Sequence, residues 1–302
     1  VSTHICFWRI DQKKFACITA LAAASCAALS HAAITFDGMG IPTDAANNGL
    51  TLLATQDAAT QFGNSSGAAQ GAPFGSELNQ LYAGLDGTSL TVSITGNLEG
   101  NFNKFFIFFD GVAGGENVLA NANSDGGFGE SNALAGLTFA DGATMDHGLR
   151  IESGGGFYGI NAFDLIDNSA AGAISGAGTG DLPLSGASGG PITNLGWDNS
   201  NGLGGSDSDG TTAATATQGW ESEIDLLALF GEVPSSVGIT ALVTNGGGDF
   251  GSHQVLPGLG SGAGNIGGNY ASTTVGVAVI PEPASLALIA AGAGLLVGRR
   301  RK

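Results

Sequence analysis

Apolar and β-branched residues alternate with polar ones in short runs along the middle of the chain, between clusters of glycine, asparagine and serine. A period of two is typical of strands, and glycine-rich clusters are typical of turns. The expected strands are 33–37, 50–55, 80–85, 89–95, 104–110, 137–140, 149–152, 158–165, 192–197, 219–229, 237–244 and 273–279, the last as an edge strand or a tether. Many short strands without a repeating helical pattern predict an all-β fold, an antiparallel β-sandwich or jelly roll.

The most apolar run is KFFIFFD, at 104–110. Phe105, Ile107 and Phe109 point to one face of this strand, and the two remaining phenylalanines point to the other. Because both faces carry large apolar side chains, we expect both to be buried and the strand to be central.

Two stretches give a mixed pattern. In ESEIDLLALF, at 221–230, the apolar positions fit either alternation or one helical turn, so we expect a strand that passes into one helical turn. From 168 to 218 the composition shifts to Gly, Ala, Ser, Asn and Asp. We interpret this stretch as long surface loops of one domain, because the strand-like run 192–197 interrupts it.

Charge is divided unevenly along the chain. Of nine Lys and Arg residues only Lys104 and Arg150 lie outside the two ends, whereas 24 acidic residues lie between 33 and 281, which leaves a net charge of −22 there. Such a body repels nucleic acids and anionic polymers unless divalent cations bridge them, so nucleic-acid binding is excluded. Glycine, at 53 of 302 residues, far exceeds its usual share of about 7%.

The N-terminal stretch combines a lysine pair, an apolar run at 15–29 and, at 30–32, the small residues that signal peptidase requires next to its cleavage site. This order predicts a secretory signal peptide over residues 1–32, exported by the Sec machinery and cut after Ala32 by signal peptidase. A rival interpretation makes Cys26 a lipid-modified cysteine. All three cysteines lie in the first 26 residues, so the exported domain needs no disulfide and offers no thiol chemistry.

The C-terminal stretch begins with the triplet Pro281, Glu282 and Pro283 and continues with an apolar run at 284–298. The chain ends in a cluster of basic residues, Arg299, Arg300, Arg301 and Lys302. The apolar run is shorter than the roughly 20 residues of a standard transmembrane helix, although it can span a thinned bilayer. We therefore expect a tether at 276–283, a transmembrane helix at 284–298 and a cytoplasmic stop-transfer end at 299–302.

This tail, VIPEPASLALIAAGAGLLVGRRRK, resembles the PEP-CTERM sorting signal, which exosortases recognise in bacteria that make extracellular polysaccharide. The triplet, the apolar segment and the arginine cluster occur in the order of that signal. The resemblance implies transient anchoring in the inner membrane, cleavage near 281–283, and release or transfer to the cell surface. The alternative is an ordinary C-terminal anchor that is never cut.

The body carries looser motifs. They are LYAGLDGTSLTVSITGNLEG at 81–100, LGWDNSN at 195–201, GWESEIDLLALFG at 219–231 and GSHQVLPGLG at 251–260. They resemble DOMON-like and family 9-like carbohydrate-binding β-sandwiches of exported proteins that carry such tails. The resemblance implies one β-sandwich domain over 33–275.

Candidates for catalysis are few. His147 and His253 each have a serine or a carboxylate close in sequence, and a Ser–His–Asp triad is recognised by geometry rather than by spacing. The G-x-S-x-G matches at 63–67 and 186–190 lack the strand–turn–helix context that places a nucleophile. We therefore expect no enzyme, with a secreted hydrolase as a remote alternative.

Binding candidates lie between residues 197 and 220. A stretch rich in Asp and Asn offers the hard oxygen ligands that Ca²⁺ prefers, with a solvated loop as the alternative. Its candidate ligands are Asp198, Asn199, Asn201, Asp207 and Asp209. Trp197 and Trp220 are candidates for stacking on sugar rings, with core packing as the alternative.

Together these features predict an exported structural or adhesive protein of the cell surface or of a biofilm and exopolysaccharide matrix. Its expected partners are an exosortase, the membrane through the C-terminal helix, and extracellular polysaccharide. The alternative is a calcium-assisted carbohydrate-binding module.

Overall fold

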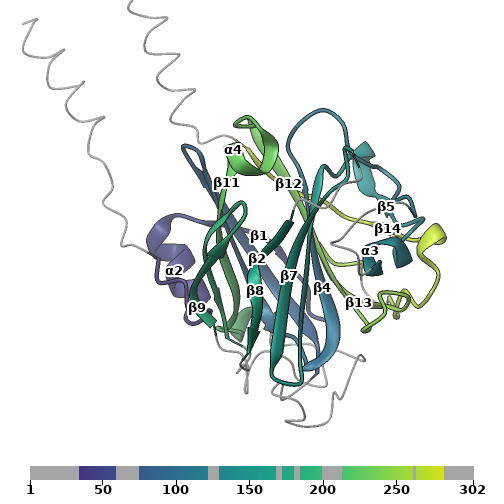
Figure 1. Ribbon diagram of the computed structural model, residues 1–302, viewed down its shortest axis with the longest axis horizontal. Coiled ribbons are helices and arrows are strands. Elements are labelled where there is room, and N and C mark those ends of the chain that lie inside the picture. Colours follow the sequence, from purple (N-terminus) through teal and green to yellow (C-terminus); the bar gives the residue numbers. More distant parts are fainter. Residues whose placement is uncertain are drawn as a thin grey trace, which may run out of the picture. The chain divides into compact units, whose positions relative to one another are not determined.

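The computed structural model describes residues 34–58, 75–121, 129–167, 172–179, 184–198, 213–260 and 263–281. The predicted signal helix and transmembrane helix lie outside these residues. The described part is a sandwich of two antiparallel sheets, as the alternating pattern predicts, with further elements packed on both outer faces (Figure 1).

Sheet A has six strands: three from the N-terminal half of the chain, followed by three from the C-terminal half, which join them where β11 pairs with β3. Its order is β1 (Thr51–Thr55), β2 (Glu77–Asp86), β3 (Ser89–Asn97), β11 (Gly219–Asp225), β10 (Ile192–Trp197) and β9 (Leu184–Gly189).

Sheet B has seven strands. Its order is β13 (Gly251–Leu256), β12 (Ser236–Thr244), β4 (Asn101–Asp110), β6 (His147–Gly154), β7 (Phe157–Asp164) and β8 (Gly172–Thr179), and β15 (Ala278–Pro281) also pairs with β12. Since β13 pairs with Ala241–Thr244 of β12 and β15 with Ser236–Ile239, the two share one edge of β12 end to end.

Strand β4 is central, and both of its faces are buried, as the sequence predicts. Phe105, Ile107 and Phe109 belong to the core between the sheets. Phe106 and Phe108 belong to a second core on the outer face of sheet B. A third layer completes that second core with α3 (Glu130–Ala133), β5 (Thr138–Phe139), η2 (Ala140–Gly142), η4 (Tyr270–Ser272) and β14 (Thr274–Val275) (Figure 1).

A short helix covers part of the outer face of sheet A. Helix α2 (Ile41–Asn48) buries Ile41 and Ala45, one helical turn apart, against Tyr82. It ends at Gly49, whose left-handed backbone (φ 69°) lets its amide donate to the carbonyl of Ala45. The remaining short elements are η3 (Ala213–Thr215) and α4 (Leu226–Phe230).

Most expected strands are present, but three expectations need correction. Residues 34–37 form no strand; they cross the outer face of β10, where a Cβ on Gly196 would lie 2.3 Å from the Asp37 amide nitrogen. The stretch 168–218, expected as loops, contains β8 and β9, whose small residues give no hydrophobic alternation. Strand β13 and helix α2 were not expected, whereas the expected passage from strand to helix at 221–230 is confirmed by β11 and α4.

Candidate functional site

The sorting triplet begins inside the folded domain. Pro281, its first residue, is the last residue of β15 and lies opposite Ser236, the first residue of β12. Proline has no amide hydrogen to donate, which suits the end of an edge strand. Residues 278–281, expected as part of a tether, are therefore a strand of sheet B.

Strand β15 is held by alternate side chains. Ala278 and Ile280 are buried in the core between the sheets, at 7% and 4% exposure, whereas Val279 between them is 57% exposed. The register places Ile280 opposite Val237 and Ala278 opposite Ile239, all within the same core. The strand thus closes the core at the point where the sorting tail begins.

The two basic residues of the body are buried side by side on the outer face of sheet B. Lys104 on β4 and Arg150 on β6 are 2% and 0% exposed. Glu152 accepts a charge-assisted hydrogen bond from Lys104, and its other carboxylate oxygen lies 3.2 Å from the Arg150 guanidinium. Glu130 on α3 lies 3.2 Å from Arg150 and 3.6 Å from Lys104. The two cations and two carboxylates form a compensated cluster.

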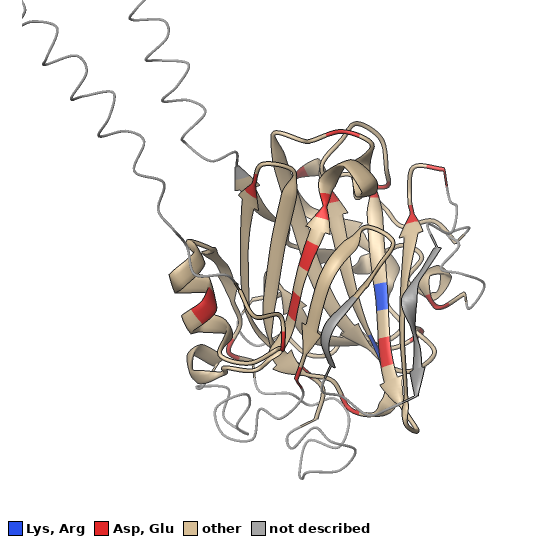
Figure 2. Ribbon diagram, turned by 60° about the vertical axis from the view of Figure 1, so that its left-hand side comes forward, with Lys and Arg blue, Asp and Glu red and all other residues tan. Residues whose placement is uncertain are grey.

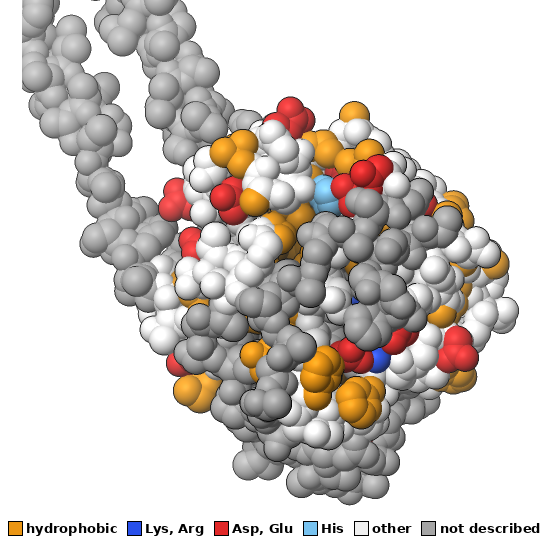
Figure 3. Space-filling view, in the orientation of Figure 1, with side chains coloured by type: hydrophobic (Ala, Val, Ile, Leu, Met, Phe, Trp, Pro, Cys, Tyr) orange, Lys and Arg blue, Asp and Glu red, His pale blue; other side chains and the backbone are white. Residues whose placement is uncertain are grey.

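This burial leaves the surface of the domain without an exposed cation, because residues 33–281 contain no other Lys or Arg. In Figure 2 the blue segments lie within strands, whereas red segments recur along strands and loops. In Figure 3 carboxylate side chains are spread over the visible face, and blue shows only as small areas beside red. The described surface therefore presents carboxylates to solvent without an exposed Lys or Arg side chain beside them, although some of the acidic residues, such as Glu77, Glu99 and Glu221, are themselves buried.

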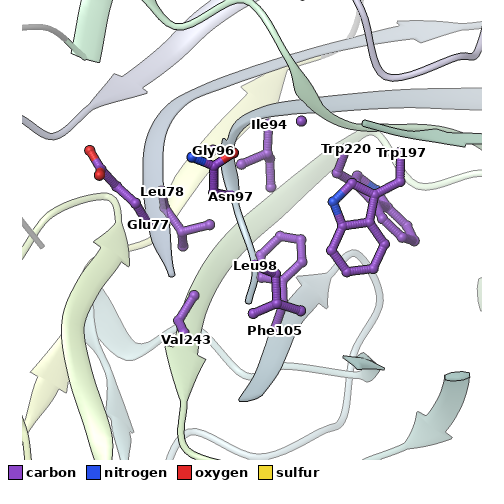
Figure 4. Close-up of a pocket in the computed structure, with 11 residues that line it drawn as sticks. Glu77, Leu78, Ile94, Gly96, Asn97, Leu98, Phe105, Trp197, Trp220 and Val243 are labelled. Atoms are coloured by element: carbon purple, nitrogen blue, oxygen red, sulfur yellow. The ribbon is translucent and has the colours of Figure 1, made fainter. Parts of the chain in front are cut away.

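Trp197 and Trp220, the candidates for glycan stacking, are 2% and 1% exposed. Their rings pack edge to face, with centroids 5.8 Å apart, and Phe105 lies 6.1 Å from Trp220. Figure 4 shows them beside a cavity that Leu98, Phe105 and Val243 also line. The cavity volume is about 10 Å³, roughly the room that one water molecule needs. Neither indole therefore offers a ring face to a sugar in this structure.

The candidate calcium ligands lie only in part within the described residues. Asp198 follows β10, is 6% exposed, and its amide donates to the carbonyl of Gly219 at 3.0 Å. Asn199, Asn201, Asp207 and Asp209 lie outside the described residues. Within the described ranges no group of three or more His, Cys, Asp and Glu side chains is arranged to hold a metal ion.

His253 lies on β13 and is 4% exposed. Its Nδ1 lies 2.9 Å from Asn265 Oδ1 and its Nε2 lies 3.0 Å from Gln254 Nε2. These contacts fit a neutral ring that donates through Nδ1 and accepts through Nε2. The neighbouring Ser252 hydroxyl donates to the backbone carbonyl of Val243 at 2.8 Å. The sequence neighbours His253 and Ser252 are therefore engaged with different partners.

His147 begins β6 and is 6% exposed. Its Nδ1 lies 3.9 Å from a carboxylate oxygen of Asp164, and its ring packs edge-on against Phe230 of α4. Burial lowers the pKa of His147, although the charge of Asp164 opposes this. Asp146 acts on His147 through its charge, which also opposes the lowering of the His147 pKa, while its Oδ2 accepts hydrogen bonds from the amides of Gly111 and Val112 at 2.7 and 2.8 Å. Its two hydrogen bonds fix the loop after β4.

A buried carboxyl that the sequence did not single out lies on the outer face of sheet A. Glu221 on β11 is 0% exposed, and its Oε2 accepts the Gly38 amide at 3.0 Å. Burial raises its pKa to about 8; the Gly38 hydrogen bond opposes the rise, and the charges of Asp44 and Asp37 add to it. The segment that leads into α2 thus covers a carboxyl with no cation beside it.

Comparison with known proteins identifies the tail. Residues 279–302 match the PEP-CTERM protein-sorting motif. No curated protein and no solved structure matches the chain. Among the described residues, no helix combines the length and apolar character needed to cross a bilayer. The match implies export, anchoring by the C-terminal tail and sorting by an exosortase.

Proposed function

We propose that this chain, which carries the sorting motif of exosortase-processed exported proteins, is a structural or adhesive protein of the cell surface or of the extracellular polysaccharide matrix. The mature domain is then a cysteine-free β-sandwich released or transferred after cleavage near Pro281, Glu282 and Pro283. The observation that carries the proposal is the sorting motif joined directly to a folded domain with an uncompensated anionic surface.

The negative surface charge determines which conditions allow such a protein to associate with an acidic polysaccharide matrix. With Lys104 and Arg150 buried, an acidic polysaccharide meets only like charge on the domain. Divalent cations reverse that repulsion by bridging carboxylates of the two polymers. The proposed association therefore requires a divalent cation and weakens as monovalent salt screens the charges.

Mass analysis of the intact protein, recovered from envelope and medium of cells with and without an exosortase, tests the sorting half of the proposal. We expect a product that ends within 281–283 only in the competent cells. A full-length tail in both strains would establish a plain membrane anchor and remove the main support for a matrix role.

Sedimentation of the purified mature domain with extracellular polysaccharide, with calcium or with a chelator, tests the second half. Co-sedimentation that the chelator abolishes supports cation-bridged association. A matched variant, with Asp198 and Asp207 both changed to Asn, separates the alternative of a specific calcium site. Loss of binding in that variant alone favours the calcium-assisted carbohydrate-binding module, whereas unchanged binding favours association through the whole surface. No co-sedimentation in any condition would contradict both.

We further propose that the role is not catalytic. The support is that His253 is engaged through both ring nitrogens, and that Ser252 donates to the backbone. Hydrolysis of ester or glycoside substrates by the wild type, lost in both His147→Gln and His253→Gln, would contradict this and favour the secreted hydrolase.

A further inference from the structure

The matched sorting motif and the fold overlap. The match starts at Val279, whereas β15 runs from Ala278 to Pro281. Three residues of the motif, Val279 to Pro281, are therefore paired with β12 in sheet B. The bonds of the Pro281-Glu282-Pro283 triplet follow the sheet without an intervening spacer.

The pairing restrains the chain on the domain side of those bonds. Ile280 and Ala278 are anchored in the core between the sheets opposite Val237 and Ile239. The predicted membrane segment begins at residue 284, three residues after Pro281, a distance of at most about 10 Å along an extended chain. The chain before the triplet is therefore held in sheet B, and the chain after it is too short before the predicted membrane segment to extend into an active site.

Peptide-bond cleavage acts on chain that has opened locally from the fold, and its rate follows the population of the open form when opening is fast. We infer that exosortase processing of this protein requires β15 to leave β12, so that the opened segment 278–281 becomes the substrate strand. This inference rests on the proposed function, because it concerns the cleavage that the sorting motif implies.

Cleavage breaks one C–N bond of the triplet. With water as the nucleophile, the domain keeps a carboxylate and the tail leaves as the amine, which takes the proton. With an amine or hydroxyl acceptor, the domain is joined to the acceptor through the same carbonyl and the tail leaves in the same form. In both cases opening of β15 precedes the bond change.

An engineered disulfide tests the requirement. Ile239→Cys and Ala278→Cys place two cysteines at directly opposed positions, and residues 33–302 contain no other cysteine. In cells that process the wild type, we expect the oxidised double variant to accumulate with its tail intact, while each single variant is cut. Non-reducing gels with thiol labelling establish that the disulfide has formed.

An insertion separates blocked access from a damaged substrate. Six Gly and Ser residues between Ile280 and Pro281 add up to about 20 Å of free chain without changing the triplet. In the disulfide-locked variant this insertion should restore cleavage. A locked protein that remains uncut with the insertion would overturn the inference, because the block would then not be one of access.

Two matched valines test the rate. Val237→Ala weakens the docking of β15 from the β12 side and leaves the sorting tail unchanged, whereas Val243→Ala makes the same truncation on β12, away from β15. In pulse-chase labelling we expect Val237→Ala to be processed roughly tenfold faster than Val243→Ala. Equal thermal unfolding midpoints of the two purified domains show that global stability is not the cause.

The outcomes separate the two proposals. A wild type that is never cut contradicts the proposed function. A wild type that is cut together with an oxidised double variant cut at the same rate contradicts this inference alone. Equal rates for Val237→Ala and Val243→Ala also count against it.

Discussion

The outer faces of the two sheets both bury charged side chains, but with different partners. On sheet B, Lys104, Arg150 and Glu152 lie together, and Glu130 of the covering layer completes two positive and two negative charges. On sheet A, Glu221 lies under the segment leading into α2, where its hydrogen-bond donors are backbone amides and two further carboxylates, Asp37 and Asp44, are nearby.

The difference shows how the surroundings decide the state of a buried acid. Glu152 has the cations Lys104 and Arg150 within reach, so a buried charge on its carboxylate is compensated by ion pairs. Glu221 loses hydration without gaining a cation, so burial favours its protonated form. We therefore expect the fold to lose stability when one member of the charge cluster on sheet B is removed. On sheet A we expect stability to depend on pH through Glu221.

Removal of one cation from the sheet B cluster should have the largest effect. Arg150→Met leaves Glu130 and Glu152 with Lys104 alone, and the free energy of unfolding should fall by about 3–5 kcal/mol, as when other buried ion pairs lose one partner. Urea denaturation of the mature domain measures the loss. The control Asp225→Asn, at the end of β11, tests a charge whose role is limited to the cap of α4. A loss below about 1 kcal/mol for Arg150→Met would mean that the cluster is solvated.

A smaller effect is expected when the cover of sheet A is loosened. Ile41→Ala removes the most buried side chain of α2, and the free energy of unfolding should fall by about 2 kcal/mol. Because solvent then reaches Glu221, we expect the pKa of that carboxyl to fall toward its usual range. Leu227→Ala on the short helix α4, half exposed, is the matched control. A pKa of Glu221 that stays near 8 in Ile41→Ala, followed by NMR of the carboxyl carbon, would show that α2 is not its cover.

Much of the sandwich is predictable because alternation reports directly which face of a strand is buried. Phe105 to Phe109 identify β4 as buried on both faces, and Asp225 marks the change from β11 to α4, where its carboxylate accepts the amides of Leu227 and Ala228. Strands β8 and β9 escape prediction because glycine, alanine and serine pair through the backbone without a hydrophobic signature. Helix α2 escapes because only Ile41 and Ala45 mark its buried side.

The sites divide in the same way. The sorting motif is found from sequence because its order of triplet, apolar run and basic end needs no tertiary information. The burial of Arg150 and Glu221 is not predicted from sequence, since each lies on a strand face that alternation alone assigns to solvent, and long-range segments cover it. Lys104 shares the apolar face of Phe106 and Phe108, but its partners Glu130 and Glu152 come from other elements and give no local signal. Trp197 and Trp220 are placed in the core by the same sheet register that pairs them.

Titration of Glu221 should give the smallest effect and the sharpest contrast between the two faces. Its pKa is about 8 in the folded protein against an ordinary 4.5. Between pH 4.5 and about pH 8, the Glu221 carboxyl therefore keeps a proton in the folded state that it has released in the unfolded state. Stability from this group is fully present below about pH 4.5 and is lost as pH rises through about 8.

Between pH 6 and pH 7 we expect the free energy of unfolding of the wild type to fall by about 1 kcal/mol more than that of Glu221→Gln, which keeps the shape of the side chain without the titration. Glu223→Gln, on the same strand and beside Thr193 and Asn194, is the matched control and should keep the wild-type slope. Urea denaturation across this pH range measures both slopes. Equal slopes for wild type and Glu221→Gln would place the pH response elsewhere, whereas a flattened slope in Glu221→Gln alone would assign it to the uncompensated face of sheet A.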